Sequence, residues 1–152
     1  MEVFNKYVDQ RTSDKIYILK ATLPADSDLK TAAKSWFADV ILSPEGDIAR
    51  SGVVAEGGRI SRSQMTTDCS AEDAPKNCIG RRRMILKYDT VTGSGVQTVE
   101  RRGLIDAYQI QNDVYMMVTS SNAIKFEQKG SRERETVENI CQSFKVGPAA
   151  LS

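Results

Sequence analysis

The chemistry open to this chain is limited first by an absence, because none of its 152 residues is histidine. Histidine is the commonest general base, a frequent zinc ligand and the usual partner of a nucleophilic serine or cysteine. A reaction would therefore have to use Asp, Glu, Lys or Tyr side chains or an external cofactor. The carboxylates do not cluster on a predicted rigid scaffold, so we predict that the protein is not an enzyme.

Two of the three cysteines are close in sequence and could form a disulfide bond. Cys69 and Cys78 flank a polar loop between two predicted strands, and neighbouring strands bring such residues together. In the chain-entropy model this bridge contributes about 2–3 kcal/mol. The alternative is a pair of free thiols, but the polar loop favours a disulfide, which implies an oxidising compartment or a redox switch. The spacing fits neither a Cys-x-x-Cys redox motif nor a zinc site.

The same loop contains three carboxylates that could offer oxygen ligands to Ca²⁺, namely Asp68, Glu72 and Asp73. Their spacing matches no EF-hand, and solvated loop charge is the alternative interpretation. No other cofactor is expected, because Gly93-Ser-Gly95 lies in a predicted hairpin and not before a helix, as a phosphate-binding loop would.

Five arginines lie in two runs after the cysteine loop: Arg81, Arg82, Arg83, Arg101 and Arg102. If the two runs meet across neighbouring strands, they could form a cationic docking patch for a partner. The alternative is surface charge with some cross-strand pairing to Glu100. The net charge is only +1, so we expect no nucleic-acid partner and at most peripheral contact with a membrane.

Most of the elements that must position these residues are strands. Strand-like runs occupy residues 84–88, 103–110 and 114–118, and the polar turn at 111–113 predicts that the last two form an antiparallel hairpin. Residues 16–19 predict an earlier strand, and 59–65 an edge strand. Residues 48–54 fit either a helical turn or a strand.

Two amphipathic helices are predicted to cover this meander. The first would be capped by Asp26 or Ser27 and keep one apolar face over residues 29–41, with Trp36 and Phe37 in the core. The second would begin at Ser131 and end at Lys145. Its apolar face would consist of Val137, Ile140, Cys141 and Phe144. We therefore expect one domain over residues 15–146, with loose ends at 1–14 and 147–152.

The order of these elements resembles the PsbP-domain family of photosystem-associated lumenal proteins. The resemblance is carried by short motifs at residues 16–24, 83–89, 113–118 and 138–146, with Lys125-Phe126 in place of an aromatic residue common before the last helix. Two features differ from the family pattern. The usual opening hairpin is missing or reduced to residues 4–7. The Cys69–Cys78 loop is not a general family feature, and this second difference favours a paralogue over the oxygen-evolving-complex subunit itself.

This resemblance implies an α+β fold, namely an α/β/α sandwich with a central antiparallel sheet of the Mog/PsbP-like type. It implies a chloroplast thylakoid-lumen location after removal of a transit peptide and, at family level, calcium binding. It further implies a non-enzymatic role in the assembly, stability or regulation of photosystem II and its oxygen-evolving complex. The partners would be photosystem proteins or assembly intermediates, and a thioredoxin-like reductant could act on the disulfide. The alternative is a Ran-GTPase-interacting module of the same fold, nuclear or cytosolic with reduced cysteines.

Overall fold

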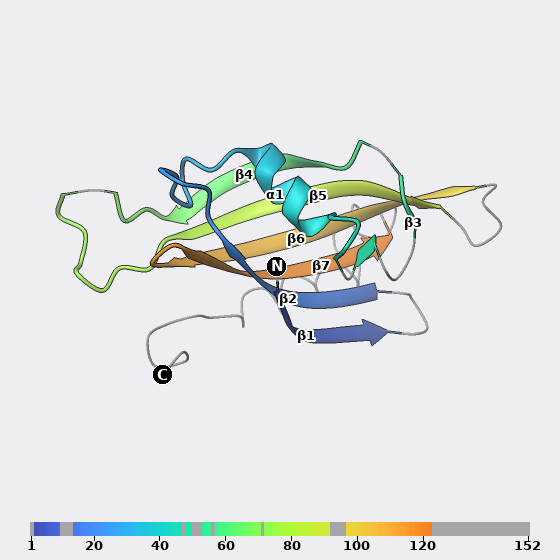
Figure 1. The fold of residues 1–152 in the computed structure, drawn as a ribbon, viewed down its shortest axis with the longest axis horizontal. Coiled ribbons are helices and arrows are strands. Elements are labelled where there is room, and N and C mark those ends of the chain that lie inside the picture. Colours follow the sequence, from blue (N-terminus) through green and yellow to red (C-terminus); the bar gives the residue numbers. More distant parts are fainter. Residues whose placement is uncertain are drawn as a thin grey trace, which may run out of the picture.

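One antiparallel sheet dominates the computed structural model, which describes residues 2–9, 14–46, 48–49, 53–55, 57–70, 72–91 and 97–122. The strand order across the sheet is β1-β2-β7-β6-β5-β3, and β4 also pairs with β5 (Figure 1). The elements are β1 (Glu2–Asp9), β2 (Asp14–Thr22), α1 (Lys34–Ile41), β3 (Val53–Val54), β4 (Arg59–Thr67), β5 (Arg81–Val91), β6 (Thr98–Ile110) and β7 (Asp113–Asn122).

The three predicted strand runs lie in β5, β6 and β7, which form an antiparallel meander as expected. Ile110 pairs with Asp113, so Gln111 and Asn112 make the tight turn between β6 and β7. Gln111 has a φ of 55° there, in the left-handed region that tight hairpin turns require. The predicted strand at 16–19 lies in β2, which pairs with β7.

Alternation along the strands sends one set of apolar side chains to the face covered by α1. Leu86, Ile105 and Val118 come from β5, β6 and β7, and all three are fully buried. Phe37 and Ile41 of α1 are also fully buried and belong to the same core cluster. Burial of such a side chain contributes about 1.5–3 kcal/mol, so this cluster is the main support of the fold. Trp36 is partly buried and packs against it, which agrees with its predicted core role.

The β6–β7 ladder is interrupted where the two strands approach most closely. A Cβ atom at Gly103 would collide with the carbonyl oxygen of Thr119, so this position requires glycine. Beside it, the Thr119 hydroxyl accepts a hydrogen bond from the Leu104 N–H at 2.9 Å and donates one to the Leu104 carbonyl at 3.2 Å. A side chain thus replaces part of the backbone ladder at the centre of the sheet.

The opposite face of the sheet also contains buried residues: Leu104, Asp106, Tyr108, Met117, Thr119 and Ser121. The predicted second helix over 131–146 and the predicted tail at 147–152 lie outside the described residues. The α+β class is confirmed by the sheet and by α1.

The first helix is shorter than predicted, because it begins at Lys34 and not at a cap near Asp26 or Ser27. Asp26 has a left-handed φ of 61°, which interrupts helical geometry. Asp28 and Thr31 then bond to each other's backbone N–H groups at 2.8 and 2.9 Å and form a compact turn. Polar side chains that bond the local backbone in this way compete with helix formation.

The amino-terminal region also differs from the predicted loose extension over 1–14. Residues 2–9 form β1 and pair with β2, with Tyr7 opposite Ile16. The run Glu2–Asp9 contains valines and aromatic residues, which favour strands. The opening hairpin that the family pattern led us to regard as reduced is therefore present as β1–β2.

The uncertain region before the cysteine loop contains both structures considered for it. Ile48 and Ala49 are helical, whereas Val53–Val54 form β3 on β5. β4 pairs with β5 alone among the described strands, in agreement with the predicted edge strand, and its ladder has two register shifts. No helix among the residues that the structure describes is long and apolar enough to cross a membrane.

Candidate functional site

The predicted arginine patch is divided between the two faces of the sheet. Arg81, Arg82 and Arg83 are consecutive in β5, and neighbouring side chains of a strand point to opposite faces. Arg82 lies on the α1 face, whereas Arg81 and Arg83 lie on the other. The five arginines predicted to form one surface therefore do not come together.

Arg82 is a buried structural residue, with 7% of its surface exposed. Its Nη1 donates to the carbonyl oxygens of Leu29 and Ala32, both at 2.8 Å, and its Nε donates to the Ser63 hydroxyl at 2.5 Å. The guanidinium also lies 4.8 Å from the ring centre of Phe37, a cation–π distance. Burial lowers the pKa of Arg82. Its assignment to a docking patch is corrected, because it joins β5, β4 and the segment before α1.

Arg101 is also buried on the α1 face, with 8% exposed. Its Nη2 donates to the Ser120 carbonyl at 3.0 Å, and its Nε and Nη2 both donate to the Ser120 hydroxyl, at 3.2 and 3.1 Å. That hydroxyl also bonds the phenol of Tyr88. Arg101 therefore stabilises the β6–β7 pairing from within the protein, and its predicted docking role is corrected for the same reason as that of Arg82.

A fully buried carboxylate, Asp106, organises the two β5 arginines on the opposite face. Arg81 binds it through two nitrogens, with Nε to Oδ1 at 2.8 Å and a second bond from Nη2 to Oδ2. Arg83 is its other cationic neighbour, with Nη2 3.5 Å from Oδ2. The guanidinium of Arg81 also lies 5.4 Å from the Tyr108 ring centre. Two guanidinium groups thus share this one carboxylate among the described residues.

Three strands carry a group of cations on this second face, which we call the basic strip: Arg59, Arg62, Arg83, Lys87 and Arg102. Arg59 pairs with Lys87 across β4–β5, and Lys87 pairs with Arg102 across β5–β6. Like charges directly opposite one another are unfavourable in a sheet, and Asp89 and Glu100 line the same surface hollow as this row.

Acidic residues neutralise the basic strip only in part. Arg102 lies 3.7 Å from Glu100 of its own strand, β6, and not across strands as the alternative interpretation expected; the Arg102 side chain is 12% exposed. Arg59 and Arg62 are exposed, and no described carboxylate forms an ion pair with either or with Lys87. The basic strip is therefore the best candidate for a docking surface in the described part of the chain.

Sequence reasoning identified only Arg83 and Arg102 of the basic strip. It missed Arg59, Arg62 and Lys87, because these residues are separated along the chain and meet only through the strand register. The one available signal was the predicted edge strand over 59–65, since alternation there would have placed arginine beside β5. Its weak hydrophobic pattern hid that signal.

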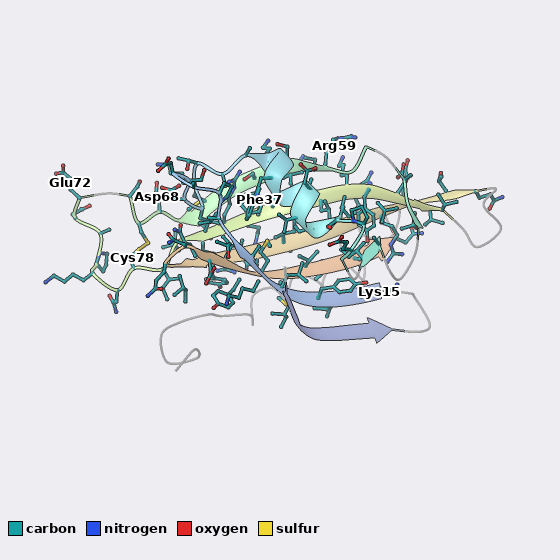
Figure 2. All side chains as sticks on the ribbon, viewed as in Figure 1. Lys15, Phe37, Arg59, Asp68, Glu72 and Cys78 are labelled. Carbon is teal, nitrogen blue, oxygen red and sulfur yellow. A yellow bond between two sulfur atoms is a disulfide. The ribbon has the colours of Figure 1, made fainter. Side chains whose placement is uncertain are left out.

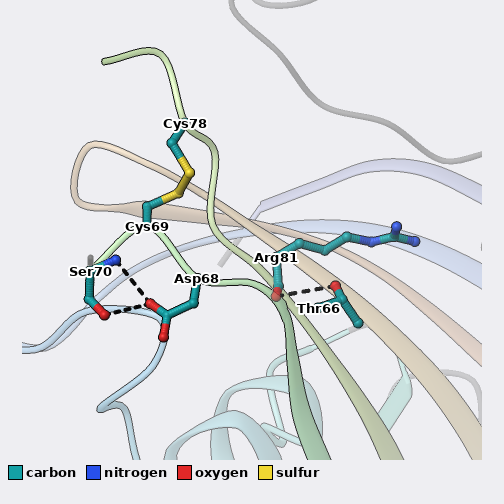
Figure 3. The surroundings of a disulfide bond; sticks show 6 residues. All are labelled: Thr66, Asp68, Cys69, Ser70, Cys78 and Arg81. Atoms are coloured by element: carbon teal, nitrogen blue, oxygen red, sulfur yellow. Dashed lines mark hydrogen bonds between the residues drawn. A yellow bond between two sulfur atoms is a disulfide. The ribbon is translucent and has the colours of Figure 1, made fainter. Parts of the chain in front are cut away.

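The cysteine loop connects the end of β4 to the start of β5, and it lies at the opposite end of β4 from Arg59 (Figure 2). Cys69 and Cys78 are joined in a disulfide with their Cα atoms 5.8 Å apart, as the sequence favoured. Figure 3 shows the Arg81 side chain directed away from this bridge, while Thr66 bonds the Arg81 carbonyl at the base of the loop. The disulfide therefore closes the connection between the two strands that carry most of the basic strip.

The loop is fastened to the segment before α1 through Asp68. Lys30 donates to its Oδ2 at 2.8 Å, and the Ser70 hydroxyl and N–H donate to Oδ1 at 2.6 and 2.9 Å (Figure 3 shows the Ser70 contacts). The Lys30 hydrogen bond, followed by those of Ser70, lowers the pKa of Asp68 well below its usual range. The same bond raises the pKa of Lys30.

These contacts correct the predicted calcium ligand set of Asp68, Glu72 and Asp73. Asp68 is already engaged by an ammonium group and a serine, while Glu72 and Asp73 are exposed, with Glu72 at the loop tip (Figure 2). The described residues contain no group of three or more His, Cys, Asp or Glu side chains that could hold a metal ion. The acidic loop residues are better explained as solvated charge.

Among solved structures, the chain is similar to cyanobacterial PsbP (CyanoP) from Synechocystis sp. PCC 6803, determined in solution. The TM-score is 0.53 at 12% sequence identity, and the match covers 93% of this chain and 72% of that chain. No protein-family model and no curated protein matches the sequence. At this identity the similarity establishes a PsbP-like fold, in agreement with the prediction, and it does not support the Ran-GTPase-interacting alternative.

Arg82→Ala should strongly destabilise the protein, because it removes three hydrogen bonds and leaves two buried carbonyls without a donor. Hydrogen bonds to charged groups contribute about 1.5–3 kcal/mol each, so urea unfolding should show a loss of at least about 3 kcal/mol. Arg62→Ala is the matched surface control and should stay within about 0.5 kcal/mol. Equal, small losses for both variants would contradict the structural role of Arg82.

Asp68 should titrate below its ordinary pKa of 3.8 in the folded protein. Lys30→Met should move that pKa back toward the ordinary value, and Ser70→Ala should do so less. Because the folded pKa is lowered, the interaction stabilises the fold above pH about 4. That stability is lost as the pH falls further toward the folded pKa. Carboxyl-carbon NMR titration measures this directly, and an unchanged Asp68 pKa in Lys30→Met would refute the tether.

Proposed function

We propose that the protein is a non-enzymatic PsbP-like protein of the chloroplast thylakoid lumen that binds photosystem II proteins or assembly intermediates. Its role would be in their assembly, stability or regulation, including that of the oxygen-evolving complex. The PsbP-like fold and the family motifs in the sequence support this proposal. A disulfide suits an oxidising compartment such as the lumen.

The observation that carries the proposal is the basic strip on a PsbP-like sheet. Arg59 and Arg62 are exposed and form no ion pair with a described carboxylate, so both are available to an acidic partner surface. Complementary charges at a protein interface accelerate encounter and select the partner. We therefore assign the docking surface to the β4–β5–β6 side of the face opposite α1.

A charge reversal in the basic strip should weaken binding to isolated photosystem II particles. We expect Arg62→Glu to lower affinity about tenfold, mainly through slower association at low salt. Lys76→Glu has the same charge change on the exposed cysteine loop and should alter affinity less than about twofold. Surface plasmon resonance at two ionic strengths measures both effects.

The native protein provides the complementary test of the same proposal. It should co-fractionate with the thylakoid lumen and with photosystem complexes. Recovery from the cytosol alone would exclude the lumenal role, and an equal loss of binding in Arg62→Glu and Lys76→Glu would exclude the basic strip as the docking surface.

We also propose that the disulfide allows redox regulation by a thioredoxin-like reductant. A cavity of about 280 Å³ lies beside the bridge, lined by Lys30, Asp68 and both cysteines among other residues, and both cysteines are partly exposed. Reduction would remove the cross-link that closes the β4–β5 connection and would loosen the loop held by Asp68.

Reduced thioredoxin should lower the thermal stability of the oxidised protein. A loss of about 2–3 kcal/mol corresponds to a fall of about 4–12 °C in Tm. The double variant Cys69→Ser with Cys78→Ser should start at the lower Tm and not respond. An unchanged Tm of the natural protein after complete reduction, verified by mass spectrometry, would reject redox regulation through this bond.

A further inference from the structure

We propose that a cavity within the basic strip binds an acidic peptide segment of the partner in which carboxylates alternate with apolar side chains. This inference deepens the proposed function and rests on it for the identity of the partner. The chemistry of the cavity itself supports it independently, because an apolar floor and positively charged walls occur together in one place.

The cavity measures about 510 Å³ and extends across three neighbouring strands. Arg62 and Gln64 line it from β4, Arg83 and Ile85 from β5, and Leu104 from β6, while Lys34 joins them from the start of α1. Strand pairing places Arg62 opposite Ile85 and Ile85 opposite Leu104, so the row across the sheet runs from cation to apolar side chains. This volume is within the range of ligand sites in proteins.

The apolar part of the cavity favours an organic ligand over a simple inorganic anion. Ile85 is half-buried and Leu104 is 4% exposed, and both border the cavity. A phosphate or sulfate ion would engage the cations but would leave this apolar surface unused. A ligand that covers Ile85 with an apolar side chain gains the free energy of removing that surface from water.

The charged part of the cavity favours carboxylates. Its described lining includes Lys34, Arg62 and Arg83 and no Asp or Glu side chain. Charge-assisted hydrogen bonds between guanidinium and carboxylate groups are among the strongest in proteins. The lining therefore complements a segment that brings negative charge on both sides of an apolar contact.

Arg83 has a specific unmet requirement. Among the described residues, its ion-pair partner is Asp106, at 3.5 Å, and Asp106 is already bound by two nitrogens of Arg81. The Nε–H of Arg83 is buried and has no acceptor. A buried donor without an acceptor is unfavourable. Arg83 lines the cavity, and a small rotation of its side chain toward a ligand carboxylate there would give the Nε–H an acceptor.

The test uses the full oxidised chain and three acetylated, amidated tetrapeptides. These are Glu-Leu-Glu-Leu, the neutral Gln-Leu-Gln-Leu and the apolar-deficient Glu-Gly-Glu-Gly. NMR titration should show shifts at the Ile85 and Leu104 methyl groups and at the Arg83 Nε–H with the first peptide. The other two should bind at least about tenfold more weakly. Equal binding of Glu-Gly-Glu-Gly would indicate charge attraction alone and would overturn the proposal.

Single substitutions test whether the peptide binds at the cavity or elsewhere on the basic strip. Arg62→Gln changes an exposed side chain and should lower the affinity for the acidic peptide about tenfold. Arg83→Lys keeps a cation near Asp106 but lacks the Nε–H, so it should also weaken binding while the protein stays folded. Arg59→Gln lies outside the cavity lining and should bind the peptide normally. Normal binding by both Arg62→Gln and Arg83→Lys would contradict the assignment.

This design distinguishes failure of the inference from failure of the proposed function. Selective peptide binding without any association with photosystem II particles would support the cavity as a peptide-binding site and would contradict the proposed partner. Association with the particles through Arg62, but with no selective binding of the peptide, would keep the docking surface and reject the cavity as its recognition site.

Discussion

Alternation of side chains along β5 is the constraint on which the rest of this structure depends. A strand directs successive residues to opposite faces, and β5 places three consecutive arginines under that rule. Arg82 must enter the core beneath α1, where it meets backbone carbonyls and the Phe37 ring. Arg81 and Arg83 must share the other face, where Asp106 holds them. The fold and the candidate docking surface thus arise from one short stretch of chain.

Each face uses its arginines differently because each offers different partners. On the α1 face, Arg82 occupies the carbonyl oxygens of Leu29 and Ala32, and this interaction connects β5 to the turn that precedes α1. On the opposite face, the Asp106 carboxylate contacts the guanidinium groups of both Arg81 and Arg83. Register then places Arg59, Lys87 and Arg102 in a row on that same face. Arg82 and Arg101 are therefore buried in structural contacts, whereas Arg59 and Arg62 stay exposed.

The sequence predicted the parts of this molecule that depend on local pattern. The strand runs at 84–88, 103–110 and 114–118, the hairpin turn before Asp113 and the Cys69–Cys78 bridge all follow from nearby residues, and the α+β class follows from their order. The start of α1 was wrong, because its outcome depends on the Asp28–Thr31 turn and on an arginine 53 residues away from Leu29. Local periodicity contains no information about such a contact.

The candidate site was only partly predictable for the same reason. Residues that are neighbours in sequence, such as Arg82 and Arg83, proved to lie on opposite faces, while Arg59 and Lys87 became neighbours through register. The sequence also did not indicate that Lys30, 38 residues earlier, is the charge partner of Asp68. Composition and spacing can suggest which residue types carry function. Pairing across strands decides which of them meet.

The sheet sorts its arginines into buried structural residues, such as Arg82 and Arg101, and exposed ones, Arg59 and Arg62. Chemical footprinting of the folded protein with phenylglyoxal, read by mass spectrometry, tests this sorting most directly. We predict rapid modification of Arg59 and Arg62, with Arg82 and Arg101 protected until the protein unfolds. Modification of Arg82 in the folded protein at the rate of Arg62 would contradict the account.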